Sequence, residues 1–264
     1  MTYERIRLTF DGPVAVLTLA HPATLNAMSR QMLTEMRDAL DVISAPARDA
    51  RCVVLTGEGR AFCSGANLSD GDIGASGAGF DASALLDEVY HPVLRRFRAL
   101  GRPLVTALNG ATVGVGMSFA LMGDLIFAAK SAYFLQAFRR IGLIPDGGAT
   151  WLLPRLIGLA RAKELSFLAE KLPAEKALDW GLINRVYDDD ALMPRTMALA
   201  HDLAAGASVA LGHLHRLYAE SPDNSYEEQL ARERDAQKLC GQSHDFAEGL
   251  AAFAEKRPPN FEGR

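Results

Sequence analysis

Two glycine-rich segments about thirty residues apart hold the residue types best suited to chemistry. The first, Asn109-Gly-Ala-Thr-Val-Gly-Val-Gly-Met-Ser118, places small residues at the predicted start of a helix. Main-chain N–H groups at such a start have no helical acceptor and can bind a developing negative oxygen. The second, Ile144-Pro-Asp-Gly-Gly-Ala-Thr-Trp151, presents a single carboxylate, that of Asp146. An anion site and one acid together suit proton transfer beside a carbonyl group.

A further segment, Phe62-Cys-Ser-Gly-Ala-Asn-Leu68, contains small residues, as does the turn Gly114-Val115-Gly116. An oxyanion hole needs two N–H groups that converge on one oxygen, and small residues are favoured there because a side chain would block the approach. Both segments could equally be tight turns between core elements. Their spacing alone leaves the two interpretations open.

Asp146 also has two interpretations. It precedes a helix that starts near Gly147 or Gly148, so its side chain could cap that helix. The helix N-terminus would then lower the carboxyl pKa and make Asp146 a weaker base. Burial beside Phe138 and Ile144 would instead raise that pKa and favour a catalytic role. The local motif does not decide between them.

An α/β scaffold is expected to position these segments. Apolar runs predict strands over residues 14–19, 52–56, 104–108 and 125–128. Helices are predicted after the N-cap Ser29 and over residues 83–100 and 117–122. Such alternation is typical of α/β folds with largely parallel strands. Residues 70–81, rich in glycine and other small residues, are expected to form a surface loop.

Beyond about Leu192 the pattern becomes wholly helical, with helices expected over residues 193–205, 208–220, 226–239 and 245–253. We therefore divide the chain into a core, residues 1–192, and a C-terminal helical assembly region, residues 193–264. The uncharged stretch 103–123 is about long enough to cross a bilayer. Its glycines and polar residues favour a buried strand, turn and helix instead.

The composition argues against several classes of protein. The chain has 264 residues, is 49% hydrophobic and carries a formal net charge of −4, so it lacks the basic surface typical of nucleic-acid-binding proteins. Three cysteines form no C-x-x-C pair, and the first residues contain no apolar signal segment. We expect a cytoplasmic protein without a membrane span. No metal site is expected, since His213 and His215 lie two apart on a helix and face different directions.

Several short motifs follow one another through nearly the whole chain. They are Leu25-Asn26-Ala27-Met28, the segments 62–68 and 109–116, Arg102-Pro103, Asp124-Leu-Ile126, Ile141-Gly-Leu-Ile-Pro145, Gly147-Gly148, Ala174-Glu-Lys-Ala-Leu-Asp-Trp-Gly-Leu182 and Glu248-Gly-Leu-Ala-Ala-Phe-Ala-Glu-Lys-Arg257. Their order and spacing resemble the enoyl-CoA hydratase/isomerase (crotonase) family. The resemblance implies a spiral of ββα units and a C-terminal helical region that builds trimers, often paired into hexamers. It also implies an acyl-CoA thioester substrate, with coenzyme A as part of that substrate and no separate cofactor.

The resemblance assigns the two oxyanion N–H groups to Ala66 and Val115. The family usually has glycine at the second of these positions, so the β-branched side chain of Val115 must point away from the thioester. The resemblance further implies that coenzyme A lies along two segments and against the C-terminal helix of its own or a neighbouring subunit, where a lysine suits its phosphate charges. The implied coenzyme A contacts are Asn26, Ala27, Met28, Ala66, Asn67, Leu68, Phe253 and Lys256.

The chain departs from the hydratases of the family. Their two glutamates fall here on Ser118 and Phe138, and neither side chain can act as a carboxylate base. The segment around Asp146 resembles the subgroup of 2-(1,2-epoxy-1,2-dihydrophenyl)acetyl-CoA isomerase, in which an aspartate at this place is the catalytic carboxylate and also moves double bonds from the 3 to the 2 position. The dehalogenase branch has an aspartate here too, but with a tryptophan in place of Phe138.

We therefore predict an acyl-CoA isomerase that shifts a double bond or rearranges a ring epoxide, with Asp146 moving a proton and two N–H groups holding a thioester enolate. One alternative is a hydratase that uses Asp146 and an ordered water. Another is a catalytically silent acyl-CoA-binding assembly subunit. His91 is a reserve acid or base. The expected apolar acyl pocket consists of Leu86, Tyr90, Phe138 and Ile144.

Overall fold

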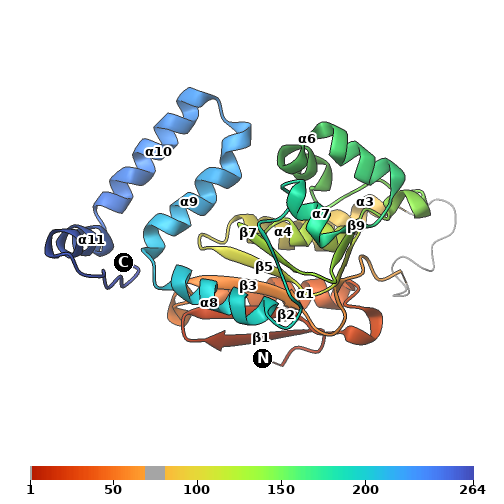
Figure 1. Ribbon diagram of the computed structural model, residues 1–264, viewed down its shortest axis with the longest axis horizontal. Coiled ribbons are helices and arrows are strands. Elements are labelled where there is room, and N and C mark those ends of the chain that lie inside the picture. The colour runs from red at the N-terminus through yellow and green to blue at the C-terminus, as the bar shows by residue number, and fades with distance from the viewer. Residues whose placement is uncertain (1, 69–80) are drawn as a thin grey trace.

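The computed structural model describes residues 2–68 and 81–264. The surface loop predicted over residues 70–81 lies outside this part of the chain, except for its last position. The described chain is α/β, as predicted, with two β-sheets, helices packed around them and a helical arm that extends to one side (Figure 1).

The larger sheet has six strands in the order β1, β2, β3, β5, β7, β10. All neighbouring pairs are parallel except β1 and β2, so the predicted largely parallel arrangement is confirmed. Every residue of β5 is buried, as expected of a parallel strand covered on both faces. The strands are β1 (Ile6–Asp11), β2 (Val14–Leu19), β3 (Cys52–Gly57), β5 (Leu104–Leu108), β7 (Leu125–Ala129) and β10 (Arg185–Tyr187).

The smaller sheet has four short strands in the order β4 (Ala61–Cys63), β6 (Ala111–Val113), β8 (Tyr133–Leu135) and β9 (Leu172–Pro173). In the chain β4 follows β3, β6 follows β5 and β8 follows β7, so the polypeptide alternates between the two sheets. Since β4 and β6 are parallel neighbours, the segments that leave them emerge at the same edge. These segments contain the two turns predicted to bind an anion.

The predicted helices are present. α1 (Arg30–Ser44) starts where expected, because the hydroxyl of Ser29 accepts a hydrogen bond from the N–H of Met32 at 3.1 Å. The helix predicted over residues 83–100 contains a π-helical turn, η3 (Leu86–Tyr90), between α3 (Ala82–Leu85) and α4 (His91–Arg98). α5 (Val115–Ala120) is buried throughout. The other elements before the last four helices are η1 (Pro22–Thr24), η2 (Pro46–Arg48), η4 (Phe138–Ile141), α6 (Ala149–Leu168) and α7 (Ala174–Asp179).

Residues 103–123 thus contain the predicted buried strand (β5) and buried helix (α5), with an additional short strand, β6, where a turn was expected. Across residues 2–68 and 81–264 no helix has the length and apolar character needed to cross a membrane.

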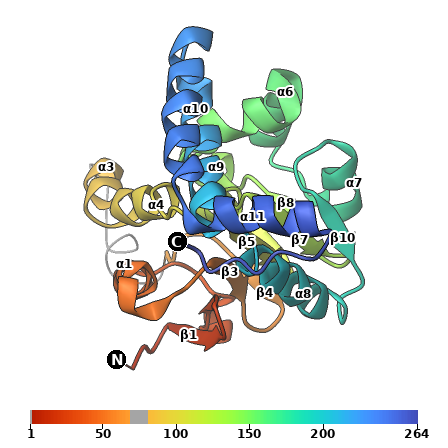
Figure 2. The same cartoon turned by 90° about the vertical axis from the view of Figure 1, so that its left-hand side faces the viewer.

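Four helices complete the chain, as predicted: α8 (Leu192–Ala204), α9 (Ser208–Glu220), α10 (Tyr226–Gly241) and α11 (His244–Glu255), with η5 (Ser221–Asp223) after α9. α8 packs against strands of the larger sheet. Residues 208–264, which we call the C-terminal arm, extend away from both sheets (Figures 1 and 2). The arm exposes large apolar side chains, namely Leu214, Tyr218, Tyr226, Leu230, Leu239, Phe246, Leu250 and Phe253.

α9 is attached to the core by a close backbone contact and a buried polar contact. A Cβ atom added at Gly212 would lie 2.3 Å from the carbonyl oxygen of Gly101, so only glycine allows this approach. The buried His215 ring lies 2.9 Å from both carboxylate oxygens of Asp124 through Nδ1 and 3.2 Å from the carbonyl oxygen of Arg98 through Nε2. The first helix of the C-terminal arm, α9, therefore has a fixed position on the core.

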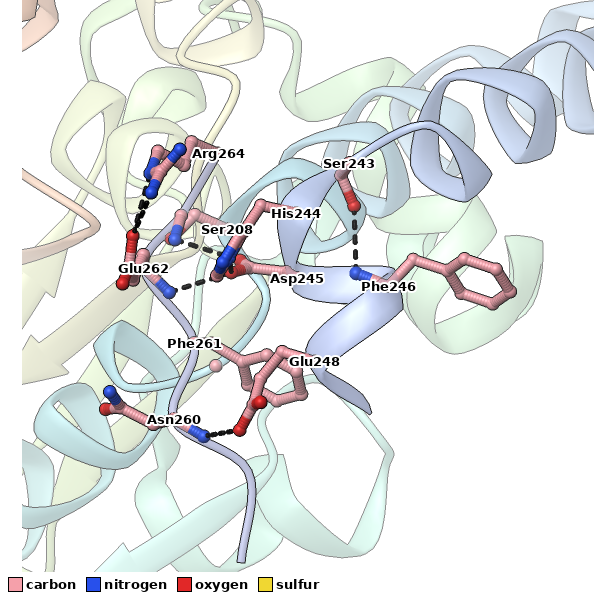
Figure 3. Close-up of polar contacts among 12 residues, drawn as sticks. Ser208, Ser243, His244, Asp245, Phe246, Glu248, Asn260, Phe261, Glu262 and Arg264 are labelled. Atoms are coloured by element: carbon pink, nitrogen blue, oxygen red, sulfur yellow. Dashed lines mark hydrogen bonds and ion pairs between the residues drawn. The ribbon is translucent and has the colours of Figure 1, made fainter. Parts of the chain in front are cut away.

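The last residues of the chain fold back along α11 (Figure 3). The buried carboxylate of Asp245 accepts hydrogen bonds from the N–H groups of Glu262 at 2.7 Å and Gly263 at 2.9 Å. Arg51, just before β3, donates to the carbonyl oxygen of Phe261 at 3.3 Å. The tail consequently links the first turn of α11 to the core.

Candidate active site

The two predicted anion-binding turns lie side by side. A Cβ atom added at Gly65 would lie 3.3 Å from the carbonyl oxygen of Val113. Gly65 and Gly114 both have a positive φ, of 105° and 54°, a conformation that glycine adopts at little cost. The parallel pairing of β4 with β6 brings the turns together, and Ala66 and Val115 directly follow the two glycines.

The N–H groups of Ala66 and Val115 are available for a ligand. Val115 is the first residue of α5, so its N–H has no acceptor within the helix. Within residues 2–68 and 81–264, neither N–H donates to another main-chain carbonyl group. Their neighbours are occupied: Gly114 donates to the carbonyl of Leu135 at 2.9 Å, and Asn67 to that of Met28 at 2.9 Å.

Cys63 supports both turns from inside the core. Its Sγ accepts a hydrogen bond from the N–H of Gly65 at 3.4 Å. A Cβ atom added at Gly116 would lie 2.7 Å from the same sulfur. Burial raises the pKa of the Cys63 thiol to about 12, so the thiol stays protonated at neutral pH. Cys63 therefore fills space beneath the turns.

The side chain of Val115 packs against the loop that carries Asp146. A Cβ atom added at Gly147 would lie 3.3 Å from Val115 Cγ2. Gly147 itself has a φ of 59°. The β-branched side chain is thus accommodated inside the protein, so position 115 can hold a residue larger than glycine.

Asp146 lies between η4 and α6, and its side chain does not cap α6. The N-cap residue of α6 is Gly148, with no side-chain hydrogen bond at the cap, so the capping interpretation is wrong. Asp146 Oδ1 is buried and has no hydrogen-bond partner among the described residues. The main-chain carbonyl of Asp146, by contrast, accepts hydrogen bonds from the N–H of Ala149 at 3.0 Å and from the hydroxyl of Ser118 at 2.8 Å.

Burial raises the pKa of Asp146 to about 6, although the charge of His91 and the aspartate's own N–H act to lower it. A carboxyl group with this pKa is mostly ionised at pH 7 and can both accept and return a proton near neutrality. The Nδ1 atom of His91 lies 2.9 Å from the carboxylate of Asp87. The site therefore contains a carboxyl group whose pKa is raised by burial, and the charge of His91 opposes that rise.

The predicted acyl-pocket residues are not all enclosed. Tyr90 and Phe138 are buried, and Leu86 is partly buried. The Phe138 ring borders the anion-binding turn, since a Cβ atom added at Gly114 would lie 3.8 Å from its Cε2. Ile144 is 79% exposed and lies two residues after Gly142, which ends η4 with a φ of 73°. Within this chain Ile144 therefore does not line an enclosed pocket.

The two segments predicted to contact coenzyme A lie against each other. The N–H of Met28 donates to the carbonyl of Gly65 at 2.8 Å, and Met28 pairs with Ala66 in a parallel bridge. Asn26 is fully buried, and its side-chain N–H groups donate to the carbonyls of Glu58 at 2.9 Å and Ala61 at 2.8 Å. The Asn26 side chain thus ties the first segment to the turn between β3 and β4 and to the start of β4. Ala27 is also buried, whereas Leu68 is exposed.

Phe253 and Lys256 lie at the end of α11, on the opposite side of the molecule from α3 and α6 in Figure 1. The Phe253 side chain is 85% exposed. Within one chain these two residues are therefore not part of the site around Asp146.

A cavity of about 520 Å³ lies elsewhere, between α6 and the C-terminal arm. Its walls are mainly apolar and include Leu152, Leu156, Leu211 and Leu214. It shares no residue with the site around Asp146. In residues 2–68 and 81–264 no group of three or more His, Cys, Asp or Glu side chains is placed to hold a metal ion.

Known proteins resemble this chain over nearly its whole length. The family model described as Enoyl-CoA hydratase/isomerase matches residues 9–264. The chain is 40% identical over 253 residues to "1,2-epoxyphenylacetyl-CoA isomerase" of Escherichia coli (strain K12), covering 95% of each protein. It is 42% identical over 264 residues to the "Probable enoyl-CoA hydratase" of Rhodobacter capsulatus, covering 100% of each.

Solved structures show the same fold. The enoyl-CoA hydratase of Bacillus anthracis superimposes with a TM-score of 0.91 at 28% identity, covering 99% of this chain and 100% of that one. An enoyl-CoA hydratase from Polaromonas sp. JS666 gives a TM-score of 0.88 at 32% identity, covering 97% and 99%. With a family match across nearly all its residues, and with these relatives and folds, the chain belongs to the enoyl-CoA hydratase/isomerase family.

Proposed function

We propose that this protein is an acyl-CoA isomerase that uses Asp146 as its acid and base. The observation that carries the proposal is a single carboxylate with a buried, unpaired oxygen on a loop that packs against Val115. Val115 and Ala66 supply the available N–H groups on the adjacent turns. A base and an anion site in one place suit chemistry through an enolate.

In the proposed reaction the carbonyl oxygen of a 3-enoyl thioester accepts hydrogen bonds from the N–H groups of Ala66 and Val115. The Asp146 carboxylate takes a proton from the carbon between the thioester and the double bond, and the released electron pair forms an enolate on the thioester oxygen. The protonated carboxyl then returns the proton to the far carbon of the former double bond. The double bond ends conjugated with the thioester, and coenzyme A takes part only as a portion of the substrate.

Two side chains favour isomerisation over hydration. The Ser118 hydroxyl is occupied by the carbonyl of Asp146, and Phe138 offers no acid or base. A water molecule at this site would therefore have one carboxylate, not two, to orient it. The hydratase alternative still has support in the names of several relatives, so the test must include hydration.

A substrate panel tests the proposal. Purified protein is given a 3-enoyl-CoA, a ring-epoxide acyl-CoA and a 2-enoyl-CoA, and products are followed by chromatography. Conversion of either of the first two without hydration of the third supports the isomerase. Rapid hydration of the 2-enoyl-CoA would support the hydratase, and binding without turnover of any of the three would support a silent acyl-CoA binder.

We also propose that the C-terminal arm assembles the chain into trimers. The apolar side chains exposed along α10 and α11, including Leu230 and Leu250, support this, because contiguous exposed apolar surface commonly marks an interface. Sedimentation equilibrium of the native protein is the measurement, with a trimer or a dimer of trimers expected. The alternation of β3, β5 and β7 with β4, β6 and β8 likewise supports a ββα spiral.

A further inference from the structure

Ser118 lies directly beneath the loop that carries Asp146. Its side chain is fully buried, and its hydroxyl donates to the main-chain carbonyl of Asp146 at 2.8 Å. A Cβ atom added at Gly147 would lie 2.8 Å from Ser118 Cβ and 3.1 Å from its hydroxyl oxygen. The backbone of the loop thus rests on the serine side chain without intervening space.

The same helix carries the anion-site donor. Val115 and Ser118 are three residues apart on α5, so they share a face of that helix. Both side chains touch the backbone at Gly147. The position of Asp146 relative to the N–H of Val115 is therefore set through one short, buried helix.

The carboxyl group of Asp146 is held less firmly than its main chain in the part of the chain that the structure describes. Asp146 Oδ1 has no hydrogen-bond partner among the described residues. His91 and Tyr90 are the titratable neighbours whose charges interact with it. Among the described residues, Asp146 is tied to α5 by the hydrogen bond that the Ser118 hydroxyl donates to its main-chain carbonyl.

We propose that Ser118 is a positioning residue, which fixes the distance between the Asp146 carboxylate and the N–H of Val115 and keeps the carboxylate turned into the site. This inference rests on the proposed isomerase function for its kinetic consequence. It also explains the departure from a carboxylate at position 118: the small side chain there is what allows the Asp146 loop to lie against α5.

The test compares Ser118→Ala with a matched control, Thr56→Val. The Thr56 hydroxyl also donates from a buried position to a main-chain carbonyl, that of Ala107 at 2.8 Å, but within the larger sheet. Both variants lose one such hydrogen bond and should lose similar thermal stability. Ser118→Ala is expected to lower kcat by about 10- to 100-fold with KM nearly unchanged. Thr56→Val should keep the wild-type kcat.

A second measurement needs no substrate. The Asp146 carboxyl is titrated by NMR in protein labelled with ¹³C at aspartate, and its signal is assigned by its absence in Asp146→Asn. In the wild type the midpoint should lie near the raised pKa of about 6. In Ser118→Ala it should move to lower pH, because a loosened loop admits water to the carboxylate. Gly147→Ala, which pushes the loop away from Ser118, should also move the titration midpoint of Asp146 to lower pH.

Equal titration midpoints in the wild type and Ser118→Ala would overturn the proposal, as would an equal loss of kcat in Ser118→Ala and Thr56→Val. Failure of the proposed function looks different. If no 3-enoyl or ring-epoxide thioester is turned over, the isomerase assignment falls, while the NMR titration still decides whether Ser118 controls Asp146.

Discussion

Gly65 and Gly114 face each other so closely that a Cβ atom on Gly65 would lie 4.0 Å from Gly114 Cα, and one on Gly114 would lie 3.8 Å from Gly65 Cα. They come from two strands of the smaller sheet that are far apart in the chain. The N–H groups that follow them belong to Ala66 and Val115. The geometry of the anion site is therefore determined by main-chain conformation, and a side chain added to either glycine should disturb it.

We predict that Gly114→Ala strongly reduces turnover. Gly114 has φ 54° and ψ −129°, a conformation that alanine adopts only at a cost of about 1–3 kcal/mol. Relaxation of that strain would move the N–H of Val115, and loss of one oxyanion donor typically lowers kcat by about 100- to 1,000-fold. Steady-state kinetics measures kcat, and Raman spectroscopy of a bound thioester measures the polarisation of its C=O bond.

Gly12→Ala is the matched control. Gly12 has a φ of 55°, and an added Cβ atom there would meet no atom within 4 Å, so the substitution strains a positive-φ position outside the site. It should lose stability but keep wild-type kcat and C=O frequency. If Gly114→Ala also kept both, Val115 would not be an oxyanion donor.

Asp146→Asn should abolish proton transfer while preserving ligand binding. The amide is nearly isosteric but cannot accept the proton, and general acid–base catalysis contributes about 100- to 10,000-fold. Wild-type kcat/KM should rise with pH through about 6, where the carboxyl ionises. Calorimetric titration with a non-reactive acyl-CoA gives the affinity. An active Asp146→Asn enzyme with an unchanged pH profile would eliminate Asp146 as the base.

The same variant makes a prediction about stability. Because the folded-state pKa of Asp146 is raised to about 6, the ionised carboxylate destabilises the folded protein at pH 7. Asp146→Asn should therefore raise the free energy of unfolding at pH 7 to 8 by roughly 2–3 kcal/mol, which is an upper value for a partly buried group. The gain should shrink as pH falls below about 6 and vanish below about 4. Urea unfolding at several pH values measures the free energy of unfolding of both proteins. A gain in stability that does not depend on pH would show that burial of the charged carboxylate does not cause the gain.

Local signals in the sequence were sufficient for four strands of the larger sheet and for the C-terminal helices, but not for the short strands of the smaller sheet. The Ser29 cap, the apolar run of β5 and the four C-terminal helices all depend on neighbouring residues, and each was predicted. β1 was missed although Ile6, Leu8 and Phe10 alternate as in a half-buried edge strand. The family motifs indicated the two turns, and the structure places these turns side by side.

The chemistry of Asp146 could not be decided locally. Whether it caps α6 depends on where that helix starts, and a left-handed Gly148 places the cap two residues later. The hydrogen bond from Ser118 joins residues 28 apart in sequence, so no local pattern predicts it. Ile144 was assigned to a pocket for its apolar side chain, yet exposed apolar side chains are common on folded proteins.

The contact between His215 and Asp124 should make the attachment of the C-terminal arm depend on pH. Burial lowers the pKa of His215, but the hydrogen bond and charge of Asp124, with the carbonyls of Arg98 and Phe97, outweigh it and raise the pKa. Since the folded-state value exceeds the unfolded one, the pair stabilises the protein fully below about pH 6.5, and this stability is lost as pH rises through the folded-state pKa.

His215→Gln should therefore lower the melting temperature more at pH 6 than at pH 9, with a loss of about 2 kcal/mol at the lower pH. His201→Gln is the control, because His201 pairs with Asp11 at 2.9 Å where both side chains are exposed, and exposed pairs contribute little. Differential scanning calorimetry across this pH range makes the comparison. Parallel pH profiles for the two variants would show that the buried pair does not control the arm.

Substitution of Lys256 tests whether a neighbouring copy of the chain contributes to the coenzyme A site. Lys256→Gln should raise KM for an acyl-CoA by about tenfold and leave KM for the matching pantetheine thioester, which lacks the nucleotide phosphates, unchanged. Lys238→Gln is the control, an exposed lysine on the adjacent α10. Because α11 and α6, the helix that follows Asp146, lie on opposite sides of the molecule in Figure 1, the contact requires the neighbour's lysine. Oligomers mixed from Asp146→Asn and Lys256→Gln chains should then regain low-KM turnover, since some sites combine an intact Asp146 with an intact Lys256 from the next copy. Mixed oligomers that show only the high KM of Lys256→Gln would mean that no lysine is shared between copies.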